Sequence, residues 1–170
     1  QGSIHGGAEL DGIAGSGKIL LSGDLRRTAF KADLAGGKVS LKAEGLVGPF
    51  ENSLDEQIDH ILIKGHALNL AEFVPSAPRT DLDFDATIVP SPQKGLALEG
   101  SIDLSNSLAA PADQNGIPVR SILGEFTVGD SGILKVHDVT ATLLEEGALI
   151  LGGETDTDKN TFALEAILKN

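Results

Sequence analysis

The sequence contains no cysteine, tryptophan, tyrosine or methionine, and basic residues are scarce. Without cysteine the chain has no disulfide, no thiol chemistry and no thiolate metal ligand. Without tryptophan and tyrosine it lacks the side chains that most often stack on bases and sugars. With 13 Lys+Arg against 25 Asp+Glu the formal net charge is -12, which excludes a protein that binds nucleic acid through a basic surface.

Long hydrophobic runs are also missing. No stretch approaches the ~20 apolar residues of a membrane-spanning helix, and no signal-peptide pattern is present. The composition, with 41% hydrophobic and 22% charged residues in a chain of 170, fits one folded domain. Because the sequence begins Gln1-Gly2-Ser3, we expect residues 1–170 to be one internal segment of a longer protein, with residues 1–3 left from expression.

Apolar and polar residues alternate through most of the chain, and this pattern predicts β-strands. In residues 81–88 the even positions are apolar, and the odd ones are Asp or Thr. Residues 96–104, 122–128 and 162–168 show the same alternation, and so do the two sides of Gly36-Gly37, a dipeptide typical of a hairpin. The sequence therefore predicts an all-β protein of about ten to twelve short strands.

Clusters of glycine and aspartate between these segments predict turns. They are Gly6-Gly7, Gly15-Ser16-Gly17, Gly48-Pro49, Asp130-Ser131-Gly132, Gly152-Gly153 and Asp158-Lys159-Asn160. Residues 69–74 are expected to form one helical turn, and residues 51–57 a long loop or a short helix. A phase change between Val136 and Val139 predicts a β-bulge near His137-Asp138.

One side of nearly every predicted strand is apolar and must be covered. A second sheet would give a sandwich, closure of the sheet would give a barrel, and an incompletely closed curl would leave a trough for an apolar ligand. Periodicity alone does not choose among these. Six Phe are the only aromatic residues, so the apolar side is lined mainly by Leu, Ile, Val, Ala and Gly. A closed sandwich of this length usually contains more large aromatic residues, which favours an interior unlike that of an ordinary sandwich.

Several segments resemble phosphate-binding or calcium-binding motifs, but each lacks residues that the motif requires. Gly12 to Lys18 fits the start of a phosphate-binding loop, yet Ile19 replaces the magnesium-binding hydroxyl, and a strand rather than a helix is expected to follow. Asp81, Asp83 and Asp85 match the first positions of a calcium-binding EF-hand loop. Ala86 and Pro92, however, occupy the positions of its glycine and its glutamate. Asp156, Asp158 and Asn160 repeat this spacing with Thr161 in the glycine position.

The histidines do not suggest a metal site either. His5, His60, His66 and His137 have no metal-site spacing, and no G-x-S-x-G nucleophile elbow is present. We therefore expect neither an enzyme nor a bound cofactor or metal.

The order of features from Leu98 onward resembles a known family. A strand at residues 98–106 is followed by a loop through Pro111 and Asp113 and by the strand entry at residues 117–123. This order resembles a repeat of the TamB family, the inner-membrane-anchored subunits of the translocation and assembly module, which belong with the AsmA-like, bridge-like lipid-transfer proteins. Residues 141–153 look like the next strand of that family, and residues 68–75 like its hinge. Ala109 to Asp113 depart from the Pro-Gly pair usual in this loop.

The resemblance implies a periplasmic protein of Gram-negative bacteria that is anchored in the inner membrane and works with an outer-membrane barrel protein of the TamA type. It implies an elongated, curled antiparallel sheet, a β-taco, whose apolar concave interior moves phospholipid between the membranes by holding the acyl chains. The alternative function is a chaperone that presents the sheet to strands of outer-membrane protein substrates. A third possibility is a purely structural sandwich or adhesin repeat.

The residues expected to line the apolar groove come from the alternating segments. They are Phe30, Leu34, Val39, Leu41, Leu82, Phe84, Ile88, Leu98, Ile102, Leu104, Ile122, Phe126, Val128, Leu134, Val136, Val139, Leu143, Phe162, Leu164 and Leu168.

Overall fold

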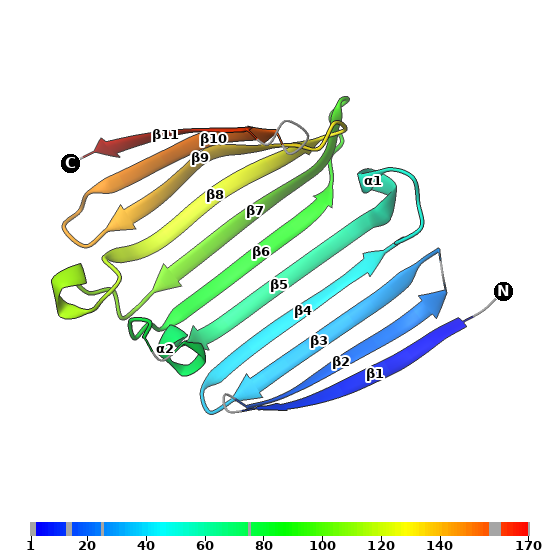
Figure 1. Cartoon of the computed structure of the whole chain (residues 1–170), viewed down its shortest axis with the longest axis horizontal. Helices are drawn as coiled ribbons and strands as arrows, with labels where there is room; N and C mark the ends of the chain where they lie inside the picture. Colours follow the sequence, from blue (N-terminus) through cyan, green and yellow to red (C-terminus); the bar gives the residue numbers. More distant parts are fainter. Residues whose placement is uncertain (1–2, 13–14, 25, 75, 157–160, 170) are drawn as a thin grey trace.

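The protein folds as a single, open β-sheet. The computed structural model describes residues 3–12, 15–24, 26–74, 76–156 and 161–169. Eleven strands lie in chain order, each antiparallel to the next, with β1 at one edge and β11 at the other. Figure 1 shows this meander from blue to red, with the two ends of the chain at opposite sides of the sheet. The predicted all-β class and long antiparallel sheet are confirmed.

The strands have similar lengths, and the helices between them are single turns. The strands are β1 (Ser3–Gly12), β2 (Gly15–Asp24), β3 (Thr28–Gly36), β4 (Val39–Val47), β5 (Ile58–Leu68), β6 (Leu82–Pro90), β7 (Leu96–Asn106), β8 (Val119–Gly129), β9 (Ile133–Leu143), β10 (Ala148–Asp156) and β11 (Thr161–Lys169). The helices are α1 (Leu54–Gln57), α2 (Leu70–Phe73) and the 3-10 turn η1 (Ala112–Gln114).

The predicted irregularities occur where the sequence placed them. Helix α2 confirms the helical turn in residues 69–74, and α1 confirms the short helix in residues 51–57. Strand β9 contains one extra residue between Val136 and Val139 relative to both β8 and β10, which confirms the bulge at His137-Asp138. Strand β5 also has a bulge at His66-Ala67, and the register shifts near strand ends at Leu46/Val47, Leu96/Leu98 and Val119/Ser121. None of these irregularities was predicted.

Some predicted turns are wrong. Gly6-Gly7 lies inside β1 and Gly152-Gly153 inside β10, where Gly7 and Gly153 leave room for the side chains of Leu20 and Leu164 on the neighbouring strands. Gly15-Ser16-Gly17 lies within β2, so the turn predicted there is wrong as well. The turn predicted at residues 158–160 lies outside the described residues.

The other predicted turns are confirmed. Chain reversals follow Gly48-Pro49 and Asp130-Ser131-Gly132. The hairpin between β3 and β4 turns at Gly37-Lys38, one residue later than expected, and Gly37 has the positive φ of +59° that a tight hairpin turn needs.

No second sheet packs on this one among the described strands, and β1 and β11 are not paired with each other. The chain exposes 11044 Å², about 40% more than the roughly 7,900 Å² expected of a compact 17.5 kDa protein. Among described side chains, the buried apolar set is only Val39, Leu82, Ala97, Leu98 and Ala141. The described strands therefore form neither a sandwich nor a barrel.

Candidate functional site: the apolar face of the sheet

The strand register divides the sheet into two faces of opposite character. Residues paired across neighbouring strands lie on the same face, and successive residues along a strand lie on opposite faces. One face, here called the apolar face, carries the even positions of β6, such as Phe84 and Ile88. The other, here called the polar face, carries Asp83 and Asp85 of the same strand.

A continuous row of apolar residues crosses the apolar face, with one residue from each strand. Its central members are Ile61 and Ile88, which pair with each other on β5 and β6. The full row is Gly6, Leu21, Phe30, Gly45, Ile61, Ile88, Gly100, Phe126, Val136, Gly153 and Leu164. No polar side chain interrupts this row.

Two further rows run beside it from β2 to β11. The first is Ile19, Ala32, Ala43, Ile63, Ala86, Ile102, Gly124, Val139, Leu151 and Ala166, in which Val139 lies against Gly124 across the β9 bulge. The second is Gly17, Leu34, Leu41, Gly65, Phe84, Leu104, Ile122, Ala141, Leu149 and Leu168. These rows also contain no charged residue.

Every predicted lining residue whose side chain is described lies on the apolar face. Leu34, Leu164 and Leu168 are exposed, three others belong to the small buried set, and the remainder are half-buried. Phe162 pairs with Thr155 in the register, but its side chain lies outside the described part. The structure thus brings the predicted residues together on one surface, although it does not show that surface as an enclosed interior.

Glycines opposite large side chains are a feature of this face that the sequence reasoning missed. Phe30, Phe84 and Phe126 pair with Gly45, Gly65 and Gly100, and a Cβ built on any of these glycines would overlap the phenylalanine ring. The rings therefore lie over the neighbouring strand instead of projecting away from the sheet. This makes the surface of the apolar face flatter. A search for glycines at register positions opposite phenylalanines would have found these pairs.

The polar face is organised by ion pairs between neighbouring strands. Lys31 and Glu44 approach to 3.6 Å, Lys64 and Asp85 to 2.8 Å, and Lys135 and Glu154 to 3.1 Å. The hydrogen bond from Lys64 to Asp85 raises the pKa of the lysine. Such exposed pairs are screened by water and contribute little to stability, so they mark the solvated side of the sheet more than they hold it together.

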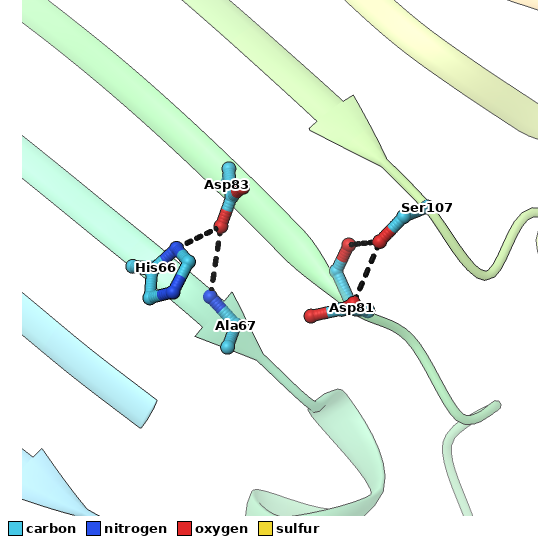
Figure 2. A network of polar contacts seen from close by, with 5 residues as sticks. All are labelled: His66, Ala67, Asp81, Asp83 and Ser107. Atoms are coloured by element: carbon cyan, nitrogen blue, oxygen red, sulfur yellow. Dashed lines mark hydrogen bonds and ion pairs between the residues drawn. The ribbon is translucent and has the colours of Figure 1, made fainter. Parts of the chain in front are cut away.

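Asp83 joins β6 to the bulge in β5, as Figure 2 shows. Its Oδ1 accepts a hydrogen bond of 2.9 Å from the backbone N–H of Ala67 and lies 2.7 Å from Nδ1 of His66. Ala67 lies in the bulge and has a left-handed φ of 53°. The bulge takes its N–H out of the hydrogen bonding between β5 and β6, and Asp83 accepts a hydrogen bond from this N–H instead. The Ala67 hydrogen bond, followed by the interaction with His66, lowers the pKa of Asp83.

A hollow of 580 Å³ lies at one end of the sheet among Lys38, Val39, Asn69 and Thr80, outside the three apolar rows. Two others lie further along the strands. One of 380 Å³ lies among Lys42, Lys64, Asp83 and Asp103, and one of 550 Å³ among Glu99, Glu125 and His137. Their lining is mostly from the polar face. None of these hollows is formed by the three apolar rows, and a concave apolar interior stays a prediction.

The motifs that suggested chemistry are explained by the sheet. Asp83 and Asp85 lie exposed on β6, and Lys18 lies within β2 instead of before a helix. His60 contacts Asp59, and His137 contacts Thr127. The described residues contain no group of three or more His, Asp or Glu that could hold a metal ion, and Asp158 and Asn160 lie outside them.

Within the described part of the chain, none of the helices has the length and apolar character needed to cross a membrane. Comparisons with protein-family models, with curated proteins and with solved structures give no match for this chain.

Proposed function

We propose that the apolar face binds phospholipid acyl chains and lets them move across the strands. In this proposal the chain is a segment of a periplasmic conduit between the inner and outer membranes of a Gram-negative bacterium, working with a barrel protein of the TamA type. The observation that carries the proposal is the set of uninterrupted, uncovered apolar rows that cross the sheet from β2 to β11. The resemblance to the TamB family supplies the membranes and the partner.

The dimensions of the sheet suit an extended acyl chain. Ten intervals of ~4.8 Å between eleven strands span about 48 Å. An acyl chain that fills half of a ~30 Å hydrocarbon layer is about 15 Å long. A tail lying across the strands would therefore cover only part of the face at any time, and this leaves room for movement along it.

The expected binding energy is moderate. Burying a CH₂ group stabilises by ~0.8 kcal/mol, so complete burial of a 16-carbon tail would contribute roughly 12 kcal/mol. An open face covers about half of the tail, which leaves roughly 6 kcal/mol before ordering costs. Contacts of this size would hold a tail without trapping it.

The uniform lining favours movement over binding at one position. None of the rows described above offers a side-chain hydrogen bond, and Leu, Ile, Val, Ala and Gly recur on strand after strand. Neighbouring positions are therefore nearly equivalent for a hydrocarbon chain. In each Phe–Gly pair the ring lies flat over the glycine, so no ring projects from the surface. A projecting ring would oppose the sliding of an acyl chain across the strands.

Photocrosslinking tests the proposal directly. A photoreactive amino acid is placed at Leu34, Ile88 or Ile102 on the apolar face, and at Ser101 on the polar face of the same strand as Ile102. The protein is then illuminated with vesicles of phosphatidylethanolamine and phosphatidylglycerol. We expect lipid adducts in mass spectra from the three apolar positions and none from Ser101. Equal capture at Ser101, or no capture anywhere, would contradict the proposal.

A chaperone for outer-membrane protein strands is the second candidate, and it is favoured by the same uninterrupted apolar rows, which would contact the apolar side of an unfolded strand. The same experiment discriminates between the two when an unfolded outer-membrane barrel protein replaces the vesicles. Polypeptide captured at apolar-face positions, with no lipid captured there in the vesicle experiment, would support the chaperone. Native mass spectrometry of the purified protein for bound lipid gives an independent check.

A further inference from the structure

Charged residues that lie opposite each other on neighbouring strands usually have opposite signs in this sheet. The pairs of opposite sign include Lys18 with Asp33, Lys31 with Glu44, Asp33 with Lys42, Lys64 with Asp85, and Lys135 with Glu154. Two pairs in the described register have like signs instead. Lys42 of β4 faces Lys64 of β5, and Asp85 of β6 faces Asp103 of β7. Like charges placed directly opposite each other destabilise a sheet, so these two pairs need a reason.

The two like-charged pairs lie in one row on the polar face, in the middle of the sheet. From β4 to β7 this row reads Lys42, Lys64, Asp85 and Asp103, so one half is positive and the other negative. All four residues line the hollow of 380 Å³, whose lining comes entirely from β4 to β7, each of which has a strand on both sides. Small-molecule sites typically have volumes of about 300–1,000 Å³.

Only the two inner charges of the row neutralise each other. Nζ of Lys64 lies 2.8 Å from Oδ1 of Asp85. Lys42 and Asp103 are exposed, and neither forms an ion pair within the part of the chain that the structure describes. Asp83, which also lines the hollow, is already engaged with the β5 bulge (Figure 2). The hollow therefore presents an ammonium group at one end and a carboxylate at the other.

We propose that this hollow binds a small zwitterion, with the anionic group of the ligand at Lys42 and Lys64 and its ammonium group at Asp85 and Asp103. Lys64 and Asp85 come from strands about 4.8 Å apart and meet at 2.8 Å, so one small molecule can reach both halves of the site. The glycerophosphoethanolamine group, a phosphate diester with an ammonium group, has this chemistry. It occurs as a free compound and as the headgroup of phosphatidylethanolamine.

The division of charge disfavours ligands that carry one sign only. An anion at Lys42 and Lys64 would lie next to the carboxylate of Asp85, and the net charge of -12 repels anions from the whole chain. A cation at Asp85 and Asp103 would lie next to Lys64. A zwitterion avoids both repulsions and reduces the repulsion within each like-charged pair. This inference does not depend on the binding of acyl chains, because the hollow and the apolar rows lie on opposite faces.

An NMR titration of the full chain tests the proposal, with the side-chain carbon signals of lysine and aspartate as the readout. Glycerophosphoethanolamine is the zwitterionic probe, whereas glycerol 3-phosphate and ethanolamine each carry charge of one sign. We expect the zwitterion to shift the signals of Lys42 and Asp103 with a millimolar dissociation constant, because exposed ion pairs are weak. Each probe of one sign should bind about fivefold more weakly or worse.

Variants that remove one outer charge test the assignment of the residues. Lys42→Gln and Asp103→Asn should each raise the dissociation constant of the zwitterion about fivefold. Their controls are Lys135→Gln and Glu99→Gln, which change the net charge equally on the same face but outside this hollow. Both controls should bind the zwitterion like the parent. Far-UV circular dichroism confirms that each variant retains its β-structure.

A short-chain phosphatidylethanolamine, used below its micelle concentration, distinguishes the two sources of the ligand. If it shifts the signals of Lys42 and Asp103 as glycerophosphoethanolamine does, the site accepts the headgroup of an intact lipid. If only the deacylated compound shifts them, the ligand is a free zwitterion. Both results agree with the proposed chemistry of the site.

Three results would overturn the proposal. The first is the absence of any shift at Lys42 and Asp103 at the highest concentration of glycerophosphoethanolamine. The second is equally tight binding of glycerol 3-phosphate or of ethanolamine, which would show that a single charge suffices. The third is equal binding by Lys42→Gln, Asp103→Asn and their two controls, which would mean that the hollow is not the site. None of these results bears on acyl-chain capture at the apolar face, which is measured separately.

Discussion

Phe84 lies over Gly65 of the neighbouring strand, so closely that a Cβ on the glycine would overlap the ring. Strand β5 therefore needs glycine at this position because of its partner, and not because of its own φ. We predict that Gly65→Ala displaces the ring and destabilises the fold by about 1–3 kcal/mol, the usual cost of overpacking. Urea unfolding followed by far-UV circular dichroism measures this, since the chain has no tryptophan.

A matched control is Gly6→Ala in the central apolar row, where an added Cβ meets nothing within 4 Å. This change should be almost neutral. Adding Phe84→Ala to Gly65→Ala should remove most of the overpacking cost, so the two changes should be strongly non-additive. Additive effects, or equal losses at Gly6 and Gly65, would contradict the role given to the pair.

Asp83 should make stability depend on pH. Its pKa in the folded protein is lowered, chiefly by the hydrogen bond from Ala67. Its contribution is therefore present above the unfolded-state pKa of about 3.9 and is lost as the pH falls through the lower folded-state pKa. We predict that Asp83→Asn is less stable than the parent at pH 7 and that the difference shrinks as the pH falls below about 4.

Urea unfolding at a series of pH values checks this expectation, with Asp103→Asn as the control. Asp103 lies on the same face, one strand beyond Asp85, and forms no ion pair or side-chain hydrogen bond with the described residues. Its replacement removes a carboxylate that accepts no backbone hydrogen bond, so we expect no comparable loss of stability at pH 7. A constant difference between Asp83→Asn and the parent at every pH would show that the carboxylate charge is not involved.

Alternation predicted the two faces of this sheet because burial in a β-strand has a period of two residues. Residues as distant as Phe30 and Leu164 were placed on one surface from their position in the pattern, and the register puts them there. The bulge near His137 was predictable for the same reason, since the pattern itself changes phase. The bulge at His66-Ala67 was not, because Gly65 contributes no apolar side chain to mark the shift.

Two features could not be predicted from the sequence: the role of glycines inside strands, and whether the sheet closes on itself. Gly153 resembles a turn residue locally, but Leu164, with which it pairs, comes from another strand, so its role is set by a contact distant in the chain. Whether the sheet closes depends on twist and edge pairing accumulated over eleven strands. No single segment encodes that sum, so sandwich, barrel and open curl stayed equally compatible with the alternation.

Thr80 connects the end of β5 to helix α2 and is only 2% exposed. Its Oγ1 donates to the carbonyl of Leu68 at 3.0 Å and accepts from the N–H of Leu70 at 2.9 Å. Thr80→Val keeps the shape but leaves both backbone groups unpaired, so we predict a loss of about 2 kcal/mol in urea unfolding. Thr80→Ser keeps both hydrogen bonds and should lose about 1 kcal/mol or less. Equal losses in the two variants would contradict this account.

Ile102 and its neighbour Ser101 provide the sharpest comparison between the two faces. Ile102 is half-buried in an apolar row of β7, and Ser101 is exposed on the polar face. A carboxylate at position 102 must be desolvated beneath any bound acyl chain, at a cost of several kcal/mol.

We therefore predict that Ile102→Asp weakens the binding of a fluorescent phospholipid at least tenfold, whereas Ser101→Asp, with the same change in charge, has little effect. Fluorescence titration measures both, and circular dichroism confirms that each remains folded. If the two variants lose affinity equally, net charge rather than the apolar rows governs binding. If neither loses affinity, the acyl chains bind elsewhere.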